Sequence, residues 1–301
     1  MKGIILAGGA GTRLYPLTIV TSKQLLPVYN KPMIYYPLST LMLAKIREVL
    51  IISTPEDTPR ISQLLGDGSQ LGMKLEYSVQ EKPEGLAQAF TIGKDFIGDD
   101  SCAMILGDNI FYGNGLNAKL SAAVKMADKG QATIFGYYVE DPERFGIMEF
   151  ERTSDDKDSG LKVLSVEEKP ANPKSNYAIV GLYFYPAGVS DMAANVKPSP
   201  RGELEITTLN EMYLQEERLH AQLLGRGFTW MDAGTIDSLR RATNFVCMIE
   251  QYQGMSISAP EEIAYRFGWI NKEQLQESAD KYGKSPYGEH LRAVLEDRIV
   301  L

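Results

Sequence analysis

The chain has 301 residues, of which 44% are hydrophobic and 23% are charged, and its formal net charge is −8. These values are typical of one large globular domain or two closely joined ones, and they exclude a disordered or collagen-like chain. The acidic balance argues against a nucleic-acid partner, because proteins that grip nucleic acid usually carry a basic surplus. Two cysteines, Cys102 and Cys247, are too few for a disulfide framework or a zinc site.

The apolar segments of the sequence are all short. None approaches the roughly 20 residues that a membrane-spanning helix needs. The start of the chain reaches glycines after about five apolar residues, which is too short for the apolar region of a signal peptide. We therefore expect a protein of the cytoplasm that has no membrane partner.

Short apolar runs alternate with helical patterns through the first part of the chain. The predicted strands are residues 2–7, 48–53, 74–79, 102–106 and 132–139, and the predicted helices are about 32–44, 58–65, 86–97 and 116–127. This alternation predicts an α/β fold with a Rossmann-like, mostly parallel sheet flanked by helices. Ligands of such sheets bind beyond the carboxyl ends of the strands, which points to the residues after Ala7 and Leu106.

The second half of the sequence has a mixed pattern. It contains predicted strands at 147–150, 163–166 and 177–185, a helix at 207–217 and an acidic loop at 154–160. The chain after Asp237 is mostly helical, and Asn271 and Ser285 are expected to cap helices there. We therefore expect a mixed α/β part followed by a helical C-terminal tail.

The first predicted strand runs into a glycine-rich turn, Gly8-Gly9-Ala10-Gly11-Thr12-Arg13. Glycines permit positive φ and a close approach of backbone N–H groups to an anion. The turn matches neither the dinucleotide fingerprint nor a Walker A loop. Arg13 and Lys23 suit a triphosphate, because the arginine guanidinium is a planar fork and the lysine ammonium is a compact point charge. The same pattern also fits a tight strand–helix turn with two surface cations.

Two aspartates follow predicted apolar strands. Asp108 comes after residues 102–106, and Asp232 comes after residues 228–231 and before Gly234-Thr235. Mg²⁺ prefers a few carboxylates together with phosphate oxygens and water, so two strand-end aspartates would suit it. Each aspartate could equally cap the helix that follows it, and the sequence does not show that the two meet in space.

Three further polar features remain open from the residues alone. Lys169 in Glu167-Glu168-Lys169-Pro170 follows a strand and fits either a binding site or a charged turn. Gln80 ends the strand 74–79, where its amide could pair with a base edge or simply face solvent. His220 and His290 lie in no motif and are expected to be structural.

Taken together, the motifs resemble the signature of the sugar-phosphate nucleotidylyltransferases. The resemblance starts at residues 8–18 and 22–27 and extends over nearly all of residues 1–295. It continues through residues 37–44, 64–68, 85–90, 106–109, 144–146, 168–170, 201–207, 230–235 and 260–264. It implies a catalytic domain at residues 1–250, with a nucleotide-binding part at about 1–140 and a sugar-phosphate-binding part at 141–235. Residues 251–301 would form an oligomer-forming or regulatory tail.

The resemblance also implies roles for individual residues. The implied nucleotide-binding residues are Leu6, Gly8, Gly9, Gly11, Thr12, Arg13, Lys23, Gln24, Gln80 and Gly85. The implied sugar-phosphate-binding residues are Asn109, Gly146, Glu168, Lys169 and Ile179. Asp108 and Asp232 would bind Mg²⁺, and Arg13, Lys23 and Lys169 would be catalytic.

The activity implied by the resemblance is Mg²⁺-dependent transfer of a nucleotidyl group from dTTP to α-D-glucose 1-phosphate, the first step of dTDP-L-rhamnose synthesis. A non-catalytic sugar-nucleotide sensor and a uridylyl- or adenylyltransferase are the alternatives, because one fold hosts many functions. The resemblance further implies a homotetramer with a regulatory nucleotide site, for which Arg226, Glu262 and Arg266 are the candidates. The apolar residues after position 250 could instead pack on the protomer's own core.

Overall fold

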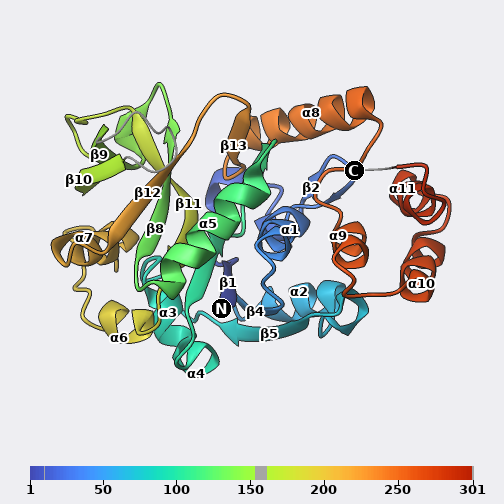
Figure 1. The fold of residues 1–301 in the computed structure, drawn as a ribbon, viewed down its shortest axis with the longest axis horizontal. Coiled ribbons are helices and arrows are strands. Elements are labelled where there is room, and N and C mark those ends of the chain that lie inside the picture. The colour runs from blue at the N-terminus through green and yellow to red at the C-terminus, as the bar shows by residue number, and fades with distance from the viewer. Residues whose placement is uncertain (10, 153–160, 300–301) are drawn as a thin grey trace.

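The computed structural model describes residues 1–9, 11–152 and 161–299. Across these residues the chain folds around a nine-stranded sheet of order β10-β9-β11-β6-β1-β4-β5, with β8 beside β11 and β12 beside β8 (Figure 1). The strands of this sheet are β1 Lys2–Leu6, β4 Glu48–Ser53, β5 Lys74–Val79, β6 Cys102–Leu106, β8 Ala132–Tyr138, β9 Gly146–Arg152, β10 Leu161–Glu168, β11 Tyr177–Tyr185 and β12 Leu219–Leu224. Two small ribbons are formed by β2 Pro27–Val28 with β3 Lys31–Pro32, and by β7 Asn109–Gly113 with β13 Phe228–Asp232.

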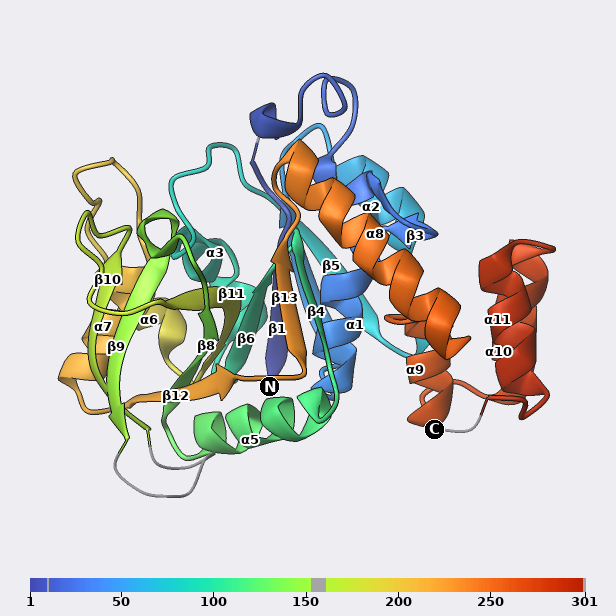
Figure 2. The ribbon, with the colours of Figure 1, turned by 90° about the horizontal axis from the view of Figure 1, so that it is seen from above.

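Helices cover both faces of the sheet. They are α1 Tyr35–Leu43, α2 Thr58–Leu65, α3 Gln88–Ile92, α4 Lys94–Ile97, α5 Leu116–Asp128, α6 Val189–Ala193, α7 Ile206–Gln215, α8 Ile236–Gln253, α9 Pro260–Arg266, α10 Lys272–Tyr282 and α11 Pro286–Leu295. Figure 2 shows α3, α6 and α7 to one side of β1, and α1 with the C-terminal helices to the other. The alternation of side chains along β1 explains both layers: Ile5 packs in the cluster with α1 and α5, and Ile4 packs in the cluster with α3 and α7.

The first half of the sheet is parallel, as the sequence predicts. Strand β1 pairs in parallel with β4 on one side and with β6 on the other, and Leu6 lies opposite Leu106. The carboxyl ends of β1 and β6 therefore meet at one edge, so the glycine-rich turn and Asp108 emerge side by side. In the second half, β11 runs antiparallel to β6, β8 and β9, which makes the whole sheet mixed.

Two predicted helices have different bounds in the structure. The helix predicted at 86–97 is divided into α3 and α4 at Gly93, which packs closely against Ile4 and Leu50. The helix predicted at 32–44 begins only at Tyr35, because Lys31 and Pro32 form β3. The predicted acidic loop at 154–160 lies outside the described residues.

The C-terminal tail packs on the body of its own chain. The side chains of Asn271 and Ser285 cap α10 and α11, as predicted. Leu275 and Leu291 are buried in the same cluster as Leu38 of α1. Much of the tail's apolar surface thus completes the core of the protomer, whereas Tyr252 on α8 stays 87% exposed. No helix in the described part of the chain is long and apolar enough to cross a membrane.

Candidate active site

The predicted site residues gather in a cleft at the carboxyl edge of the sheet. A cavity of about 330 Å³ is lined by Leu6, Gly8, Gly9, Arg13, Lys23, Gln80, Gly85, Asp108, Asn109, Glu168, Lys169 and Asp232, among others. An adjoining hollow of about 210 Å³ shares Arg13 and Lys169 with it and adds Gly146 and Ile179. The structure therefore brings together the two groups of residues that the sequence places far apart along the chain.

Asp108 forms an ion pair with a predicted phosphate-binding lysine. Its Oδ2 lies 2.5 Å from Nζ of Lys23, and its Oδ1 accepts a hydrogen bond of 3.0 Å from Nδ2 of Asn109. Burial raises the pKa of the Asp108 carboxyl, but the Lys23 ammonium and the two hydrogen bonds outweigh burial and hold the pKa below its usual range. The Asp108 carboxyl is therefore held in its ionised form.

Asp232 reaches the same point through the β7–β13 ribbon. In this antiparallel pair, Asp232 lies opposite Asn109, the neighbour of Asp108, and the N–H of Ala233 donates to the carbonyl of Asp108. The Oδ1 of Asp232 accepts a hydrogen bond of 2.8 Å from the N–H of Gly234. Burial and the nearby negative charge of Asp108 raise the pKa of Asp232.

The two carboxylates fit a magnesium site. A Cβ atom built on Gly234 would lie 2.8 Å from Oδ1 of Asp232, 3.4 Å from Oδ2 of Asp108 and 2.8 Å from Nη2 of Arg13, so all three side chains converge there. In the described residues, no group of three or more His, Cys, Asp or Glu side chains could hold a metal ion. Two carboxylates alone suit Mg²⁺, which completes its shell with phosphate oxygens and water.

The predicted nucleotide side of the cleft is formed by glycines and the amides of Gln80 and Gln88. A methyl group on Gly8 would overlap Oε1 of Gln80, so only glycine leaves room for that amide. The Nε2 of Gln80 donates to Oε1 of Gln88 at 2.6 Å. Gly85, at φ 118°, lets the loop that carries it approach the backbone of Leu204. These contacts hold the Gln80 amide at the cleft wall.

The predicted sugar side of the cleft is built around Glu168 and Lys169. The Thr207 hydroxyl donates to Oε2 of Glu168 at 2.5 Å, and Nζ of Lys169 lies 3.4 Å from Oε1 of the same carboxylate. Lys169 has φ 42°, which is uncommon for a residue other than glycine. Residues with such strained backbone conformations cluster at functional sites. Gly146 lies close by, since a Cβ built on it would be 3.2 Å from Oε2 of Glu168.

Asn109 links the two sides of the cleft. Its Oδ1 accepts hydrogen bonds from Nε1 of Trp230 at 2.6 Å and from the N–H of Gly181 at 3.2 Å, while its Nδ2 donates to Asp108. Because both ends of the amide are engaged, its orientation is set by the network. Asn109 therefore positions Asp108 as well as lining the sugar side.

The chain is similar to known proteins over nearly its whole length. The sequence profile of the nucleotidyl transferase family matches residues 2–248. A glucose-1-phosphate thymidylyltransferase of Xanthomonas campestris pv. campestris is 54% identical over 293 residues, which are 97% of this chain and 96% of the relative. A protein of the same name from Mycobacterium tuberculosis is 52% identical over 296 residues, which are 98% of this chain and 99% of the relative. The chain belongs to the nucleotidyl transferase family.

Solved structures share the fold of this nucleotidyl transferase. A crystal structure described as a glucose-1-phosphate thymidylyltransferase of Bacillus anthracis in complex with sucrose has a TM-score of 0.70 and 40% identity, covering 81% of this chain and 94% of that one. A UDP-glucose pyrophosphorylase complexed with UDP-glucose has a TM-score of 0.72 at 21% identity, covering 82% of this chain and 98% of that one. At that identity the second likeness concerns the fold alone.

Arg201 is a cation of the cleft of this nucleotidyl transferase that was not predicted from the sequence. Arg201 lines the cavity, with its Nη1 3.6 Å from Oε1 of Glu168 and its Nε 3.5 Å from Oε1 of Glu205. The string Arg201-Gly202-Glu203-Leu204-Glu205 is part of the resemblance, but its mixed charges gave no reason to place the arginine at a phosphate. Only the tertiary approach to Glu168 reveals it.

Some predicted residues lie behind the cleft or away from it. Gln24 is 1% exposed and packs against the backbone near Gly107, and its Oε1 accepts a hydrogen bond from Ser22. Thr12 begins the short 3₁₀ turn η1, Thr12–Leu14, and Gly11 caps it at φ 62°. Neither Gly11 nor Thr12 lines the cavities just described. They shape the turn that carries Arg13.

The three candidate regulatory residues do not form one site within the described protomer. Glu262 and Arg266 pair along α9, with Nε of Arg266 2.7 Å from Oε1 of Glu262, and Nε2 of His290 lies 2.7 Å from the other carboxylate oxygen. Arg226 instead lines a hollow with Tyr137 and Phe228, beyond the end of β12. His290 is thus a buried partner of Glu262, in keeping with a structural role.

Proposed function

We propose that the chain transfers the thymidylyl group of dTTP to α-D-glucose 1-phosphate, giving dTDP-glucose and pyrophosphate. The observation that carries this proposal is the convergence of Asp108, Asp232 and Arg13 on Gly234, in a cleft that Lys169 also lines. The names of relatives at 52–54% identity supply the substrates.

The attacking group needs no general base. A phosphate monoester has a second pKa of about 6, so the sugar phosphate is already an anion near neutral pH. A phosphate oxygen of glucose 1-phosphate forms a bond to the α-phosphorus of dTTP, and the bond from that phosphorus to the bridging oxygen of pyrophosphate breaks. In the described chain, no histidine lines the cleft. Catalysis then rests on positioning and on neutralising charge.

Each cation of the cleft has a place in this scheme. Arg13 stabilises the charge that grows on the pyrophosphate, because its guanidinium can hold two oxygens at once. Lys23 keeps Asp108 ionised and lies within reach of the triphosphate from the same pocket wall. Lys169 holds the phosphate of the attacking sugar. Glu168, which lies beside it, accepts hydrogen bonds from the sugar hydroxyls.

Asp108 and Asp232 are the residues that would hold Mg²⁺. Mg²⁺ bound there would supply positive charge that offsets the negative charge of the reacting phosphates. The chain's own contribution is to fix the two carboxylates through the β7–β13 ribbon and the Gly234 N–H.

The experiment that tests the proposal is a panel of dTTP, UTP, ATP and GTP with glucose 1-phosphate, with pyrophosphate release as the readout. Rapid release with dTTP and formation of dTDP-glucose are the expected results. A clear preference for UTP or ATP would make the chain a uridylyl- or adenylyltransferase. Binding of nucleotide without release from any of the four would instead support a non-catalytic sensor.

We infer in addition that the protein is a homotetramer that binds an inhibitory deoxysugar nucleotide away from the cleft. Two features support this. Tyr252 is 87% exposed on α8, and Met248 one turn earlier is 47% exposed. Arg226 lines a hollow that neither Glu262 nor Arg266 lines, as expected if these residues meet only across two protomers. Residues 251–301 would then serve regulation, outside a catalytic domain at residues 1–250.

A further inference from the structure

A lysine outside the cleft forms a buried ion pair with the end of α8. The side chain of Lys31 is 2% exposed, and its Nζ lies 2.9 Å from Oε1 of Glu250, whose side chain is 8% exposed. The ammonium also donates to Oδ1 of Asn30 at 2.7 Å and lies 5.1 Å from the ring centre of Tyr36. Nothing in the proposed reaction uses this lysine.

Glu250 joins three segments of the chain. Its Oε1 accepts from Lys31 and from the N–H of Ile257 at 3.0 Å, and its Oε2 accepts from Nδ2 of Asn30 at 2.7 Å and from the Ser256 hydroxyl at 3.4 Å. The carboxylate therefore fastens the β2–β3 ribbon, the last turn of α8 and the start of the tail at one point.

Two arms lead from this ion pair to the cleft. The first is residues 22–34, which carry Lys23 and Gln24 and fold back on themselves through β2 and β3. The N–H of Met33 donates to the carbonyl of Leu26, and the N–H of Ile34 donates to the carbonyl of Gln24. The position of Lys31 is thus transmitted to the backbone of Gln24, next to Lys23.

The second arm is helix α8. It begins at the Thr235 cap, three residues after Asp232, and its last turn carries Glu250. A helix of this length is stiff, so a contact at its far end constrains the direction of its start. The ion pair therefore joins the two arms at one end. At their other ends the arms carry Lys23 and Asp232, which lie in the proposed phosphate and metal site.

Stability alone does not account for such a pair. Removing two charges from water costs about as much as their attraction returns, and apolar replacements of similar volume are often as stable. The best-attested use of a buried pair is to specify one arrangement of the segments it joins. We propose that the Lys31–Glu250 pair is a positioning device, which holds the Lys23 arm against the Asp232 arm in the geometry that binds the nucleoside triphosphate.

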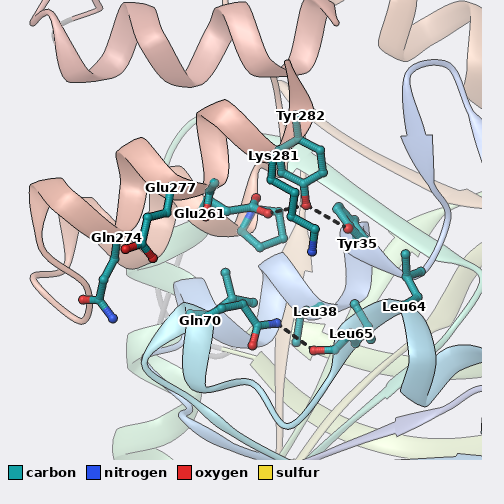
Figure 3. A pocket seen from close by; sticks show the side chains of 13 residues that line it. Tyr35, Leu38, Leu64, Leu65, Gln70, Glu261, Gln274, Glu277, Lys281 and Tyr282 are labelled. Carbon is teal, nitrogen blue, oxygen red and sulfur yellow. Dashed lines mark hydrogen bonds between the residues drawn. The ribbon is translucent and has the colours of Figure 1, made fainter.

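The tail supports the same arm from a second direction. A cavity of about 180 Å³ lies between the tail and the body. On its wall the Tyr282 hydroxyl donates to Oε1 of Glu261 at 2.8 Å and lies 3.4 Å from the Tyr35 hydroxyl (Figure 3). Tyr35 is the first residue of α1, directly after the arm. The tail thus contacts the residue that directly follows the Lys23 arm.

This inference rests on the proposed function, because its main test is kinetic. In Lys31→Met, the apolar stem is kept and Glu250 retains Asn30, Ser256 and the Ile257 N–H as partners. We expect an apparent KM for dTTP raised, and kcat lowered, by about tenfold to 100-fold. The KM for glucose 1-phosphate should change less, because Glu168 and Lys169, the proposed sugar-phosphate contacts, lie at the end of β10 and outside both arms. The double variant Lys31→Met/Glu250→Gln also removes the negative charge of Glu250, which Lys31→Met leaves without a cation. It should show the same raised KM for dTTP, with a smaller change in the KM for glucose 1-phosphate.

Tyr287→Phe is the matched control. It removes a buried hydrogen bond of 2.6 Å from the Tyr287 hydroxyl to Oε2 of Glu261, within the tail, and keeps the ring that faces Lys31. A lower melting temperature with unchanged kinetic constants is expected. If the Lys31 variants also lose only melting temperature, or if both KM values rise together, the pair is merely structural and the inference is wrong.

The two proposals can fail separately. A wild-type protein that releases pyrophosphate from none of the nucleotides overturns the proposed function. In that case calorimetric titration with dTTP still tests the positioning device: weaker binding to Lys31→Met than to wild type and Tyr287→Phe supports it, and equal binding to all three overturns it.

Discussion

The Nζ of Lys23 lies 2.5 Å from Oδ2 of Asp108, inside a cleft where both groups are largely shielded from water. Lys23 supplies the positive charge that keeps this carboxylate ionised. A metal ion held by Asp108 would add positive charge at the same point, and Lys23 itself lines the cleft. The pair thus links two proposed roles, metal binding and nucleotide binding, in one contact.

Asp108→Asn and Asp232→Asn are each expected to lower kcat by about 1000-fold or more, because a metal site of two carboxylates contributes several kcal/mol to the transition state. Pyrophosphate release over a series of Mg²⁺ concentrations measures the loss, and circular dichroism checks the fold. Asp99→Asn, at an exposed position, is the control. Activity close to wild type at saturating Mg²⁺ in either variant would remove that residue from the metal site.

Lys169→Ala is expected to raise the KM for glucose 1-phosphate by about tenfold or more, since a charge-assisted contact to phosphate contributes about 1.5–3 kcal/mol. The KM for dTTP should change little. Initial rates with each substrate varied in turn measure the two constants. An increase confined to the dTTP constant would place Lys169 on the nucleotide side instead.

Arg13→Ala is expected to act differently, by lowering kcat about 100-fold with smaller changes in KM. The reason is that its contact strengthens as charge develops on the pyrophosphate, so its loss falls mainly on the transition state. Steady-state kinetics at saturating substrates provide the measurement. A variant that binds dTTP weakly but turns over at the wild-type rate would show that Arg13 serves binding alone.

Much of the site follows from local sequence patterns. The apolar runs 2–7 and 102–106 predict neighbouring strands, and the parallel rule then places Gly8 and Asp108 at one edge. The meeting of Asp108 with Asp232 could not be predicted in this way. It depends on the register of β7 with β13, two short strands that are more than 100 residues apart along the chain. Antiparallel pairing at that separation leaves no signal in either segment alone.

Buried charge was equally hidden from the sequence. Lys31 stands in a stretch, Tyr29-Asn30-Lys31-Pro32, that is typical of an exposed turn, yet its ammonium is buried against Glu250. A partner 219 positions away decides the environment of such a residue, and local composition carries no trace of it. Gly93 shows the opposite case: a glycine within a helical pattern is a recognised breaker, and it does divide α3 from α4.

Gly8→Ala is expected to raise the KM for dTTP, because the added methyl group would overlap Oε1 of Gln80 and push this amide from the cleft wall. Gly225→Ala is the matched control, since a Cβ at that position meets no atom within 4 Å and its φ is not positive. Kinetic constants and melting temperatures of both variants are compared. Equal KM values for dTTP would show that Gln80 takes no part in binding the nucleotide.

Glu262→Gln is expected to lower stability in a pH-dependent way. Burial raises the pKa of Glu262, but the contacts to His290 and Arg266 outweigh burial, so the pKa in the folded state lies below the ordinary value of roughly 4.3. The stabilisation is then present above pH ~4.3 and is lost as the pH falls through the lower, folded-state pKa.

Melting temperatures of wild type and Glu262→Gln from pH 3 to 7 test this expectation. At pH 7 the variant should be less stable by about 2 kcal/mol, as for the loss of a hydrogen bond to a charged group. The difference should shrink at the acidic end. Glu277→Gln, on the exposed face of α10, should show no such trend. A constant difference at every pH would mean that the charge of Glu262 does not contribute.

Arg266→Ala tests the proposed regulation. Arg266 is partly exposed at the end of α9, where its Nε pairs with Glu262 and its Nη2 donates to the carbonyl of Ile299 at 3.0 Å. A guanidinium carries more N–H donors than these two contacts use, which suits the diphosphate of a sugar nucleotide. The variant should keep its activity, because Arg266 is outside the cleft, but should lose much of its inhibition by dTDP-rhamnose. Inhibition constants measured at several dTTP concentrations, with light scattering for the oligomeric state, give the answer. Unchanged inhibition that is purely competitive with dTTP, or a monomer at micromolar concentration, would contradict a second nucleotide site between protomers, since coupling requires two distinct sites.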